Sequence, residues 1–84
     1  MERSEVIQKV NGILEDEFEV DGELLTPEAT LYEELNLDSL DAVDLIVALE
    51  REFEITIDRK SAEKRIREIR TLADVYSFIE TTLG

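Results

Sequence analysis

Apolar side chains recur at intervals of three and four residues in four segments of the chain, and this spacing constrains the fold more than any other feature. It places the side chains on one face of a helix, whereas a strand would need strict alternation. The four faces are Val6, Ile7, Val10, Ile13 and Leu14; Ala42, Leu45, Ile46, Leu49 and Phe53; Ala62, Ile66 and Ile69; and Leu72, Val75, Tyr76, Ile79 and Leu83. A chain of 84 residues has room for one small domain. We therefore predict an all-α fold, a small four-helix bundle with a long first loop and a short third helix, forming a single domain over residues 1–84.

Polar residues predict where these helices begin. Ser4, Asp58 and Thr71 can each accept hydrogen bonds from the free N–H groups of the helical turn that follows. Asp74 occupies the reciprocal capping-box position three residues after Thr71. We expect the second helix to span residues 39 to about 53.

The first connection, residues 20–37, is unusually long for so small a protein. Connections of this length are commonly functional or internally packed. Leu31 and Leu35 lie four residues apart, which predicts one helical turn packed on the core.

The charge and the missing residue types exclude several functions. The chain has 22 acidic and 9 basic residues, a net charge of -13, and neither Cys nor His. A basic face for nucleic acid is therefore excluded, and anionic membranes are disfavoured. No disulfide, thiol nucleophile or imidazole base is available. There is no signal-like N-terminus and no run of roughly 18 apolar residues, so we expect a cytoplasmic monomer that meets basic partners and binds neither nucleic acid nor membrane.

The charge is unevenly distributed along the chain. Residues 1–58 hold 18 acids and 3 bases, whereas residues 59–84 hold 4 acids and 6 bases. All six bases of the second part fall between Arg59 and Arg70. The acidic character therefore belongs to the first two-thirds of the chain.

The second predicted helix has more apolar surface than a small bundle needs. Leu40, Val43 and Val47 form a second stripe, rotated by about a third of a turn from the core stripe. Acidic residues flank it on both sides: Asp41, Asp44, Glu50 and Glu54. Either the stripe is covered by the long loop or the third helix, or it is an exposed docking surface for a basic, grooved partner.

The dipeptide Asp38-Ser39 stands at the head of this helix. Taken alone, it is most often an N-cap, since both side chains accept hydrogen bonds from first-turn amides. Ser39 has no neighbouring base to raise its nucleophilicity. If Ser39 reacts, another protein must supply the base.

The stretch Leu-Asn-Leu-Asp-Ser-Leu-Asp-Ala-Val-Asp-Leu, residues 35–45, resembles the signature of acyl carrier proteins. In that family an Asp-Ser-Leu triplet opens the second helix, and an acidic and apolar recognition helix follows. The likeness includes the first helix, the Leu31–Leu35 turn, Ile57 and the last helix through Ile79, and so covers nearly the whole chain.

The resemblance implies a carrier and not an enzyme. Ser39 would be the attachment site of 4'-phosphopantetheine, moved from coenzyme A by a separate phosphopantetheinyl transferase, and acyl groups would be held on its thiol as thioesters. Asp38 would help the transferase and its metal ion to engage. The resemblance assigns partner docking to the exposed side of the second helix: Leu40, Asp41, Val43, Asp44 and Val47, with Glu50 at the edge. No residue of the carrier itself would be catalytic or hold a metal.

The partners implied are the acyl-transfer, condensing and reducing enzymes of fatty acid synthesis, which would carry basic docking patches. A specialised carrier for polyketide, lipid-modification or aminoacyl chemistry is the alternative of the same class. An unmodified acidic protein-interaction domain is the alternative of a different class.

Two positions depart from the family pattern. Asn36 stands where the family usually has glycine two residues before the aspartate, but asparagine tolerates the left-handed conformation better than most residues. The third helix is about one turn longer, and the addition includes Arg65, Arg67 and Arg70. These cations either relieve repulsion from the acidic body or form a modified partner surface.

Residues 17–28 follow the spacing of a calcium-binding loop. However, Glu17 and Glu19 occupy ligand positions that need the shorter Asp or Asn, and Pro27 precedes the last ligand position, Glu28. We therefore do not expect a true EF-hand.

Overall fold

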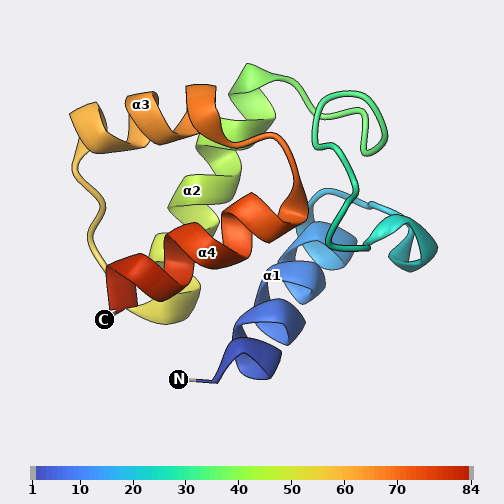
Figure 1. Ribbon diagram of the computed structural model, residues 1–84, viewed down its shortest axis with the longest axis horizontal. Coiled ribbons are helices and arrows are strands. Elements are labelled where there is room, and N and C mark those ends of the chain that lie inside the picture. The colour runs from blue at the N-terminus through green and yellow to red at the C-terminus, as the bar shows by residue number, and fades with distance from the viewer. Residues whose placement is uncertain (1, 84) are drawn as a thin grey trace.

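The computed structural model describes residues 2–83 and is built from helices connected by loops (Figure 1). The elements are α1 (Arg3–Glu17), the 3₁₀ turn η1 (Gly22–Leu24), α2 (Ser39–Phe53), α3 (Arg59–Glu68) and α4 (Leu72–Leu83). The predicted all-α bundle, with its long first connection and short third helix, is confirmed. No helix within residues 2–83 combines the length and apolarity that crossing a membrane requires.

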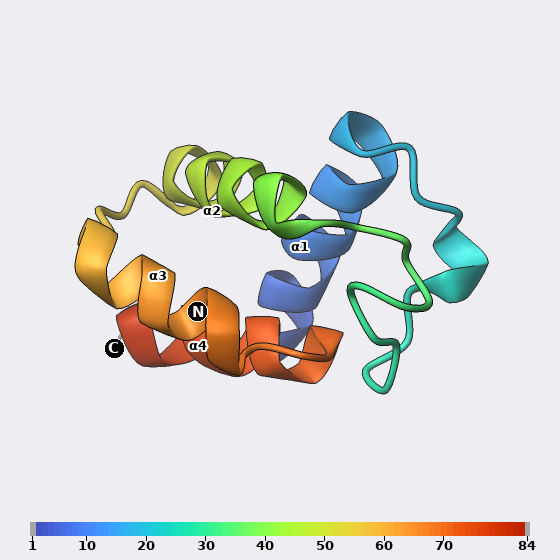
Figure 2. The ribbon, with the colours of Figure 1, turned by 90° about the horizontal axis from the view of Figure 1, so that it is seen from above.

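The core lies where α1, α2 and α4 pack together, and α3 covers one side of α2 (Figures 1 and 2). Its largest fully buried side chains are Tyr76, Leu14, Leu31, Leu49, Leu72, Ile79, Val6, Val10 and Val75. Most of these residues belong to the faces that the apolar spacing predicts. No side chain classed as buried in the described chain is charged, so the acidic charge stands at the surface.

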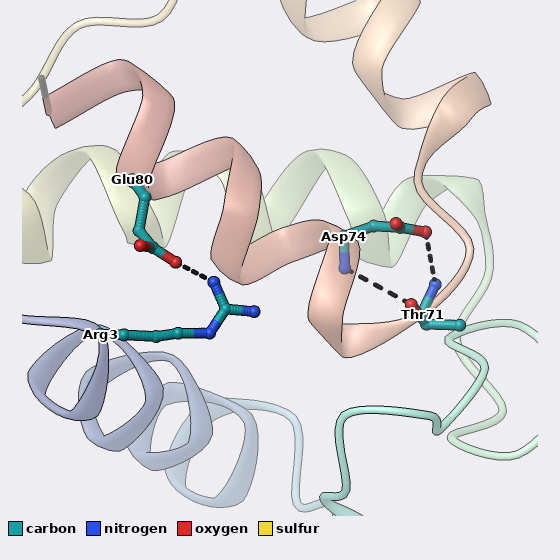
Figure 3. Close-up of polar contacts among 4 residues, drawn as sticks. All are labelled: Arg3, Thr71, Asp74 and Glu80. Carbon is teal, nitrogen blue, oxygen red and sulfur yellow. Dashed lines mark hydrogen bonds and ion pairs between the residues drawn. The ribbon is translucent and has the colours of Figure 1, made fainter.

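One predicted cap is wrong. Ser4 does not precede α1 but lies inside its first turn, because the carbonyl of Glu2 already accepts the N–H groups of Glu5 and Val6. The Glu2 side chain makes no capping bond. This turn is instead attached to α4 by an ion pair between Arg3 and Glu80 (Figure 3).

The caps of α3 and α4 are confirmed. The Asp58 carboxylate accepts the N–H of Ser61. Asp74 N–H donates to Thr71 Oγ1, and the Asp74 carboxylate accepts the N–H of Thr71 (Figure 3). The same carboxylate also accepts the N–H of Arg70 at 2.9 Å. The bond from Arg70 is the main cause that lowers the pKa of Asp74 below its usual value. A charged Asp74 therefore closes the start of α4 at neutral pH.

The long connection gathers at one end of the bundle (Figures 1 and 2). The Leu31 N–H donates to the carbonyl of Arg70 (2.9 Å), and the Leu72 N–H donates to the carbonyl of Ala29 (3.1 Å). These bonds form a single antiparallel bridge between Thr30 and Thr71. The connection is thus attached to the segment that joins α3 to α4.

The helical turn predicted at Leu31–Leu35 is present. The carbonyl of Thr30 accepts the N–H groups of Glu34 and Leu35, and both leucines are buried. The turn therefore positions the chain that enters α2.

The calcium-loop spacing at residues 17–28 has another explanation in the fold. The Asp21 carboxylate caps η1 by accepting the N–H of Glu23 at 3.0 Å. Across residues 2–83, no three acidic side chains are placed to hold a metal ion together.

Candidate functional site

The entrance to α2 is held by a reciprocal pair of aspartates. Asp41 N–H donates to Asp38 Oδ1 (2.9 Å), and Asp38 N–H donates to Asp41 Oδ2 (3.1 Å). Asp38 is therefore the N-cap, and Ser39 is the first residue of the helix. The side chain of Ser39 is exposed, so its hydroxyl faces solvent at the positive end of the helix dipole.

The backbone before this helix turns through Asn36. Asn36 has φ 58°, the left-handed conformation that we expect where the family has glycine. Leu35 and Leu37 on either side are buried, and the Leu37 N–H donates to the carbonyl of Leu31 at 3.0 Å. Two buried leucines thus anchor the turn, and the residues that follow them project outward.

The second apolar stripe of α2 is exposed. Leu40 is 75% exposed, Val43 36% and Val47 39%, so of the two alternatives the exposed stripe holds, and coverage by the loop or α3 does not. The reason is geometric: the core already takes another face of the helix, about a third of a turn away. That face consists of Ala42, Leu45, Ile46, Ala48, Leu49 and Phe53.

The carboxylates around the stripe differ in their surroundings. Asp44 is exposed, whereas Asp41 is half-buried and bonded to the backbone of Asp38. Glu50, which we placed at the edge of the docking face, is half-buried too. Its Oε2 accepts the N–H of Ile57 at 3.2 Å and holds the segment after α2 against the helix. Glu50 therefore has a role within the fold, and Asp44 is the freer of these acids.

A small apolar cavity lies on the buried side of α2, with a volume of about 20 Å³. It is lined by α2, the end of α3, α4 and the Leu31 turn: Leu31, Tyr32, Ala42, Leu45, Ile46, Leu49, Ile66, Ile69, Val75 and Phe78. This volume is about that of one water-sized sphere, so the cavity has room for no larger group.

Two exposed residues of the long first connection were not singled out from the sequence. Tyr32 is 38% exposed, lines the cavity and donates its hydroxyl to the carbonyl of Ile66 at 3.4 Å. Leu24 is 44% exposed beside a cleft that Leu37 and Asp41 also line. Neither belongs to a periodic apolar face, so only the folded loop reveals them.

The site presents a hydroxyl without activating it. Within residues 2–83, no hydrogen bond joins the Ser39 side chain to another side chain, and the sequence has no imidazole or thiol. The first N–H groups of a helix have no intrahelical acceptor. The entrance to α2 can therefore receive an anionic group on Ser39.

The family whose description is "Phosphopantetheine attachment site" matches residues 8–79. The chain belongs to the acyl carrier proteins. It is 47% identical over 84 residues to the acyl carrier protein of Thermosynechococcus vestitus, covering 100% of this chain and 99% of that one. It is 40% identical over 82 residues to that of Thermotoga maritima, covering 98% and 96%.

A solved structure agrees with the sequence comparisons. The crystal structure of an acyl carrier protein from Thermotoga maritima superposes with a TM-score of 0.79 at 31% identity, covering 99% of this chain and 92% of that one. The protein is therefore a non-catalytic carrier, and its cofactor is phosphopantetheine. Both predictions made from the resemblance are confirmed.

Proposed function

We propose that Ser39 is the residue that receives 4'-phosphopantetheine, and that residues 1–84 act as one carrier domain. Three observations support this assignment. Ser39 is exposed, it begins α2, and the N–H groups of its turn can face the new phosphodiester. The exposed hydroxyl is the observation that carries the proposal.

In the transfer, Ser39 Oγ forms a bond to the phosphorus that bears pantetheine in coenzyme A. The bond from that phosphorus to the bridging oxygen of the pyrophosphate breaks, and adenosine 3',5'-bisphosphate leaves. The serine proton passes to a base of the transferase, because this chain has no His or Cys to accept it. The same lack means that no thiol of the carrier competes for acyl groups. Asp38, beside the serine, contributes charge for the transferase and its metal ion to engage.

We infer that partner enzymes dock on the exposed stripe Leu40, Val43 and Val47. The stripe offers apolar contact, and Asp41 and Asp44 beside it offer charge to a basic patch. The net charge of -13 steers such partners from a distance and makes the encounter sensitive to salt. Acyl-transfer, condensing and reducing enzymes of fatty acid synthesis in the cytoplasm are the proposed partners of this monomer.

Intact mass spectrometry tests the attachment site. Incubation with coenzyme A, Mg²⁺ and a broad-specificity phosphopantetheinyl transferase adds one phosphopantetheinyl group to the wild type and to Ser61→Ala. Ser61 is the matched control, since it is an exposed serine in the first turn of α3. Ser39→Ala gains nothing. A wild type that stays unmodified would overturn the proposal, and a Ser39→Ala variant that gains the same mass would place the attachment on another residue.

The docking surface is tested by removing one charge at a time. Asp44→Asn raises the KM of the transferase for the carrier several-fold, because the basic patch loses a partner. Asp16→Asn, an exposed aspartate near the end of α1, leaves that KM close to the wild-type value. Equal effects of the two substitutions would mean that only net charge matters.

A further inference from the structure

The positive charge of this acidic protein is concentrated at α3 and the residues just after it. Residues 60–70 contain five bases and two acids. The five bases are exposed, and we call them the α3 basic surface: Lys60, Lys64, Arg65, Arg67 and Arg70. No other segment of the chain has a comparable excess of bases.

Apart from Arg65, whose guanidinium carbon lies 5.9 Å from the centroid of the Phe78 ring, these cations make few contacts that hold the fold together. Elsewhere in the described chain, Arg3 pairs with Glu80 and Arg51 with Glu17 at 2.9 Å. On the α3 basic surface, Arg65 has one ion pair, at 3.5 Å to Glu68 of the same helix. Within residues 2–83, Arg67 and Arg70 have no carboxylate within 4.0 Å of their guanidinium groups. Cations that served only to offset the acidic body would be expected to lie against its carboxylates.

A cleft adjoins Arg67 and Arg70. Its volume is about 320 Å³, and it is lined by Thr30, Tyr32, Glu33, Arg67, Ile69 and Arg70. The Tyr32 hydroxyl bonds to the carbonyl of Ile66, which fixes the ring against the last turn of α3. Exposed tyrosine and arginine around a cleft are the residue types that contribute most to protein interfaces.

We propose that the α3 basic surface and this cleft bind an acidic segment of a protein partner. Carboxylates of the partner would pair with Arg67 and Arg70, and an adjoining side chain would pack on Tyr32. This site is independent of Ser39 and of the docking stripe on α2. It gives the carrier a second contact surface, opposite in charge to the first.

Other anionic partners fit less well. A membrane surface needs an apolar face to insert, but Ala62 and Ile69 are buried and Ile66 is half-buried. Nucleic acid needs contacts to many phosphates, and a body of net charge -13 repels it. The same net charge opposes a second copy of this chain. An acidic peptide segment places only a few carboxylates against this surface.

The two surfaces can be occupied together. On α2, Ala42, Leu45 and Ile46 line the cavity that α3 also lines. At about 100° per residue, Val43 and Val47 lie about a third of a turn around the helix from these residues. The docking stripe and the α3 basic surface therefore face different directions, and one partner leaves the other surface free.

The test is a pair of titrations of the ¹⁵N-labelled chain at low salt, followed by amide chemical shifts. A peptide of four glutamates shifts amides at residues 60–70 and 30–33. A peptide of ten lysines, titrated separately, shifts those at residues 39–47. No saturable shift with the glutamate peptide, or shifts spread over the whole chain, would overturn the proposal. The lysine titration and the modification of Ser39 report separately on the carrier function.

Variants make the test specific. Arg67→Gln/Arg70→Gln weakens binding of the glutamate peptide roughly fivefold or more, as expected for two lost charge pairs. Ser4→Glu/Gln8→Glu changes the net charge equally, at exposed positions of α1, and leaves the affinity within about twofold of wild type. Thermal unfolding verifies that both variants fold. Equal loss in the control, binding to phosphatidylglycerol vesicles in place of the peptide, or dimerisation that depends on Arg67 and Arg70 would each contradict an acidic protein partner.

Discussion

The hydroxyl of Tyr76 on α4 donates a 2.6 Å hydrogen bond to the amide oxygen of Asn11 on α1. The ring is 1% exposed, and burial raises the pKa of Tyr76 above its usual value, against smaller opposing effects of Asn11 and Arg3. This contact joins α1 to α4 across the helix pair that Arg3 and Glu80 also join.

We predict that stability falls as pH rises through about 10 and above. The folded state holds the Tyr76 proton more tightly than the unfolded state, so the stabilisation is complete below pH 10 and is lost as pH climbs through the raised pKa. Urea unfolding between pH 8 and 11 measures this slope. Tyr76→Phe reduces the decline and costs about 1 kcal/mol at pH 7. A decline that is as steep in Tyr76→Phe as in the wild type would contradict the assignment.

Gly12→Ala is expected to stabilise the protein by about 1 kcal/mol, because glycine in a helix interior is disfavoured by that amount. A Cβ at this position meets nothing within 4 Å. The melting temperature should rise by roughly 4–8 °C for a domain of this size. Gly22→Ala serves as the contrast, since its Cβ would lie 3.1 Å from Glu15 Oε1. An equal rise of the melting temperature in both variants would show that the helical position of Gly12 is not the cause.

Glu54→Gly is expected to raise the free energy of unfolding by about 1 kcal/mol. Glu54 ends α2 in the left-handed conformation, with φ 54° and ψ 46°, which glycine adopts without strain. The same change at Glu52, exposed within α2, should cost about 1 kcal/mol. If the backbone of Glu54 is strained, chemical denaturation shows a higher free energy of unfolding for Glu54→Gly and a lower one for Glu52→Gly than for the wild type.

Two substitutions at Asp38 distinguish its role as the N-cap of α2 from its proposed role in engaging the transferase. Asp38→Ala removes the acceptor for the Asp41 N–H and should destabilise the chain by about 1 kcal/mol. Asp38→Asn keeps an acceptor there, so its melting temperature stays near the wild-type value while the charge is lost. If the transferase needs that charge, Asp38→Asn is modified slowly although it is folded. Normal modification rates in Asp38→Asn would assign Asp38 to the cap alone.

Added salt is expected to raise the melting temperature. Residues 1–58 carry 18 acids against 3 bases, and ions screen their mutual repulsion. Differential scanning calorimetry from low to moderate NaCl concentration follows the change. A flat or falling melting temperature would show that repulsion between the acids does not limit stability.

The sequence was sufficient to predict the helices and most of the core, because apolar spacing reports directly on which face of a helix is buried. Asp58 and Thr71 were recognisable as caps for a similar local reason. The cap predicted at Ser4 is wrong because serine also fits inside the first turn of a helix. The ion pair that attaches this turn to α4 joins Arg3 and Glu80, which lie 77 residues apart in the sequence. No local pattern contains such a contact.

The site was predictable only in part. The spacing identified Leu40, Val43 and Val47 as a second stripe, but periodicity cannot say what covers a stripe, and only the packing of the other face decided it. The bond from the Ile57 N–H to Glu50 depends on how the chain leaves α2, so the role of this glutamate within the fold is not visible in the spacing. The position of Tyr32 is set by its hydrogen bond to Ile66, 34 residues away in the sequence, so no local pattern predicts it.

The bridge between Thr30 and Thr71 has a consequence for the order of folding. The bridge closes a loop that contains α2 and α3. Closing this loop costs conformational entropy, and only a few hydrogen bonds compensate for it, whereas each helix forms through local contacts. The bridge should therefore form after the helices and open before them. Because the Leu31 turn and the entrance to α2 follow directly from it, the amides ahead of Ser39 should exchange with solvent deuterium faster than those of α1 and α4.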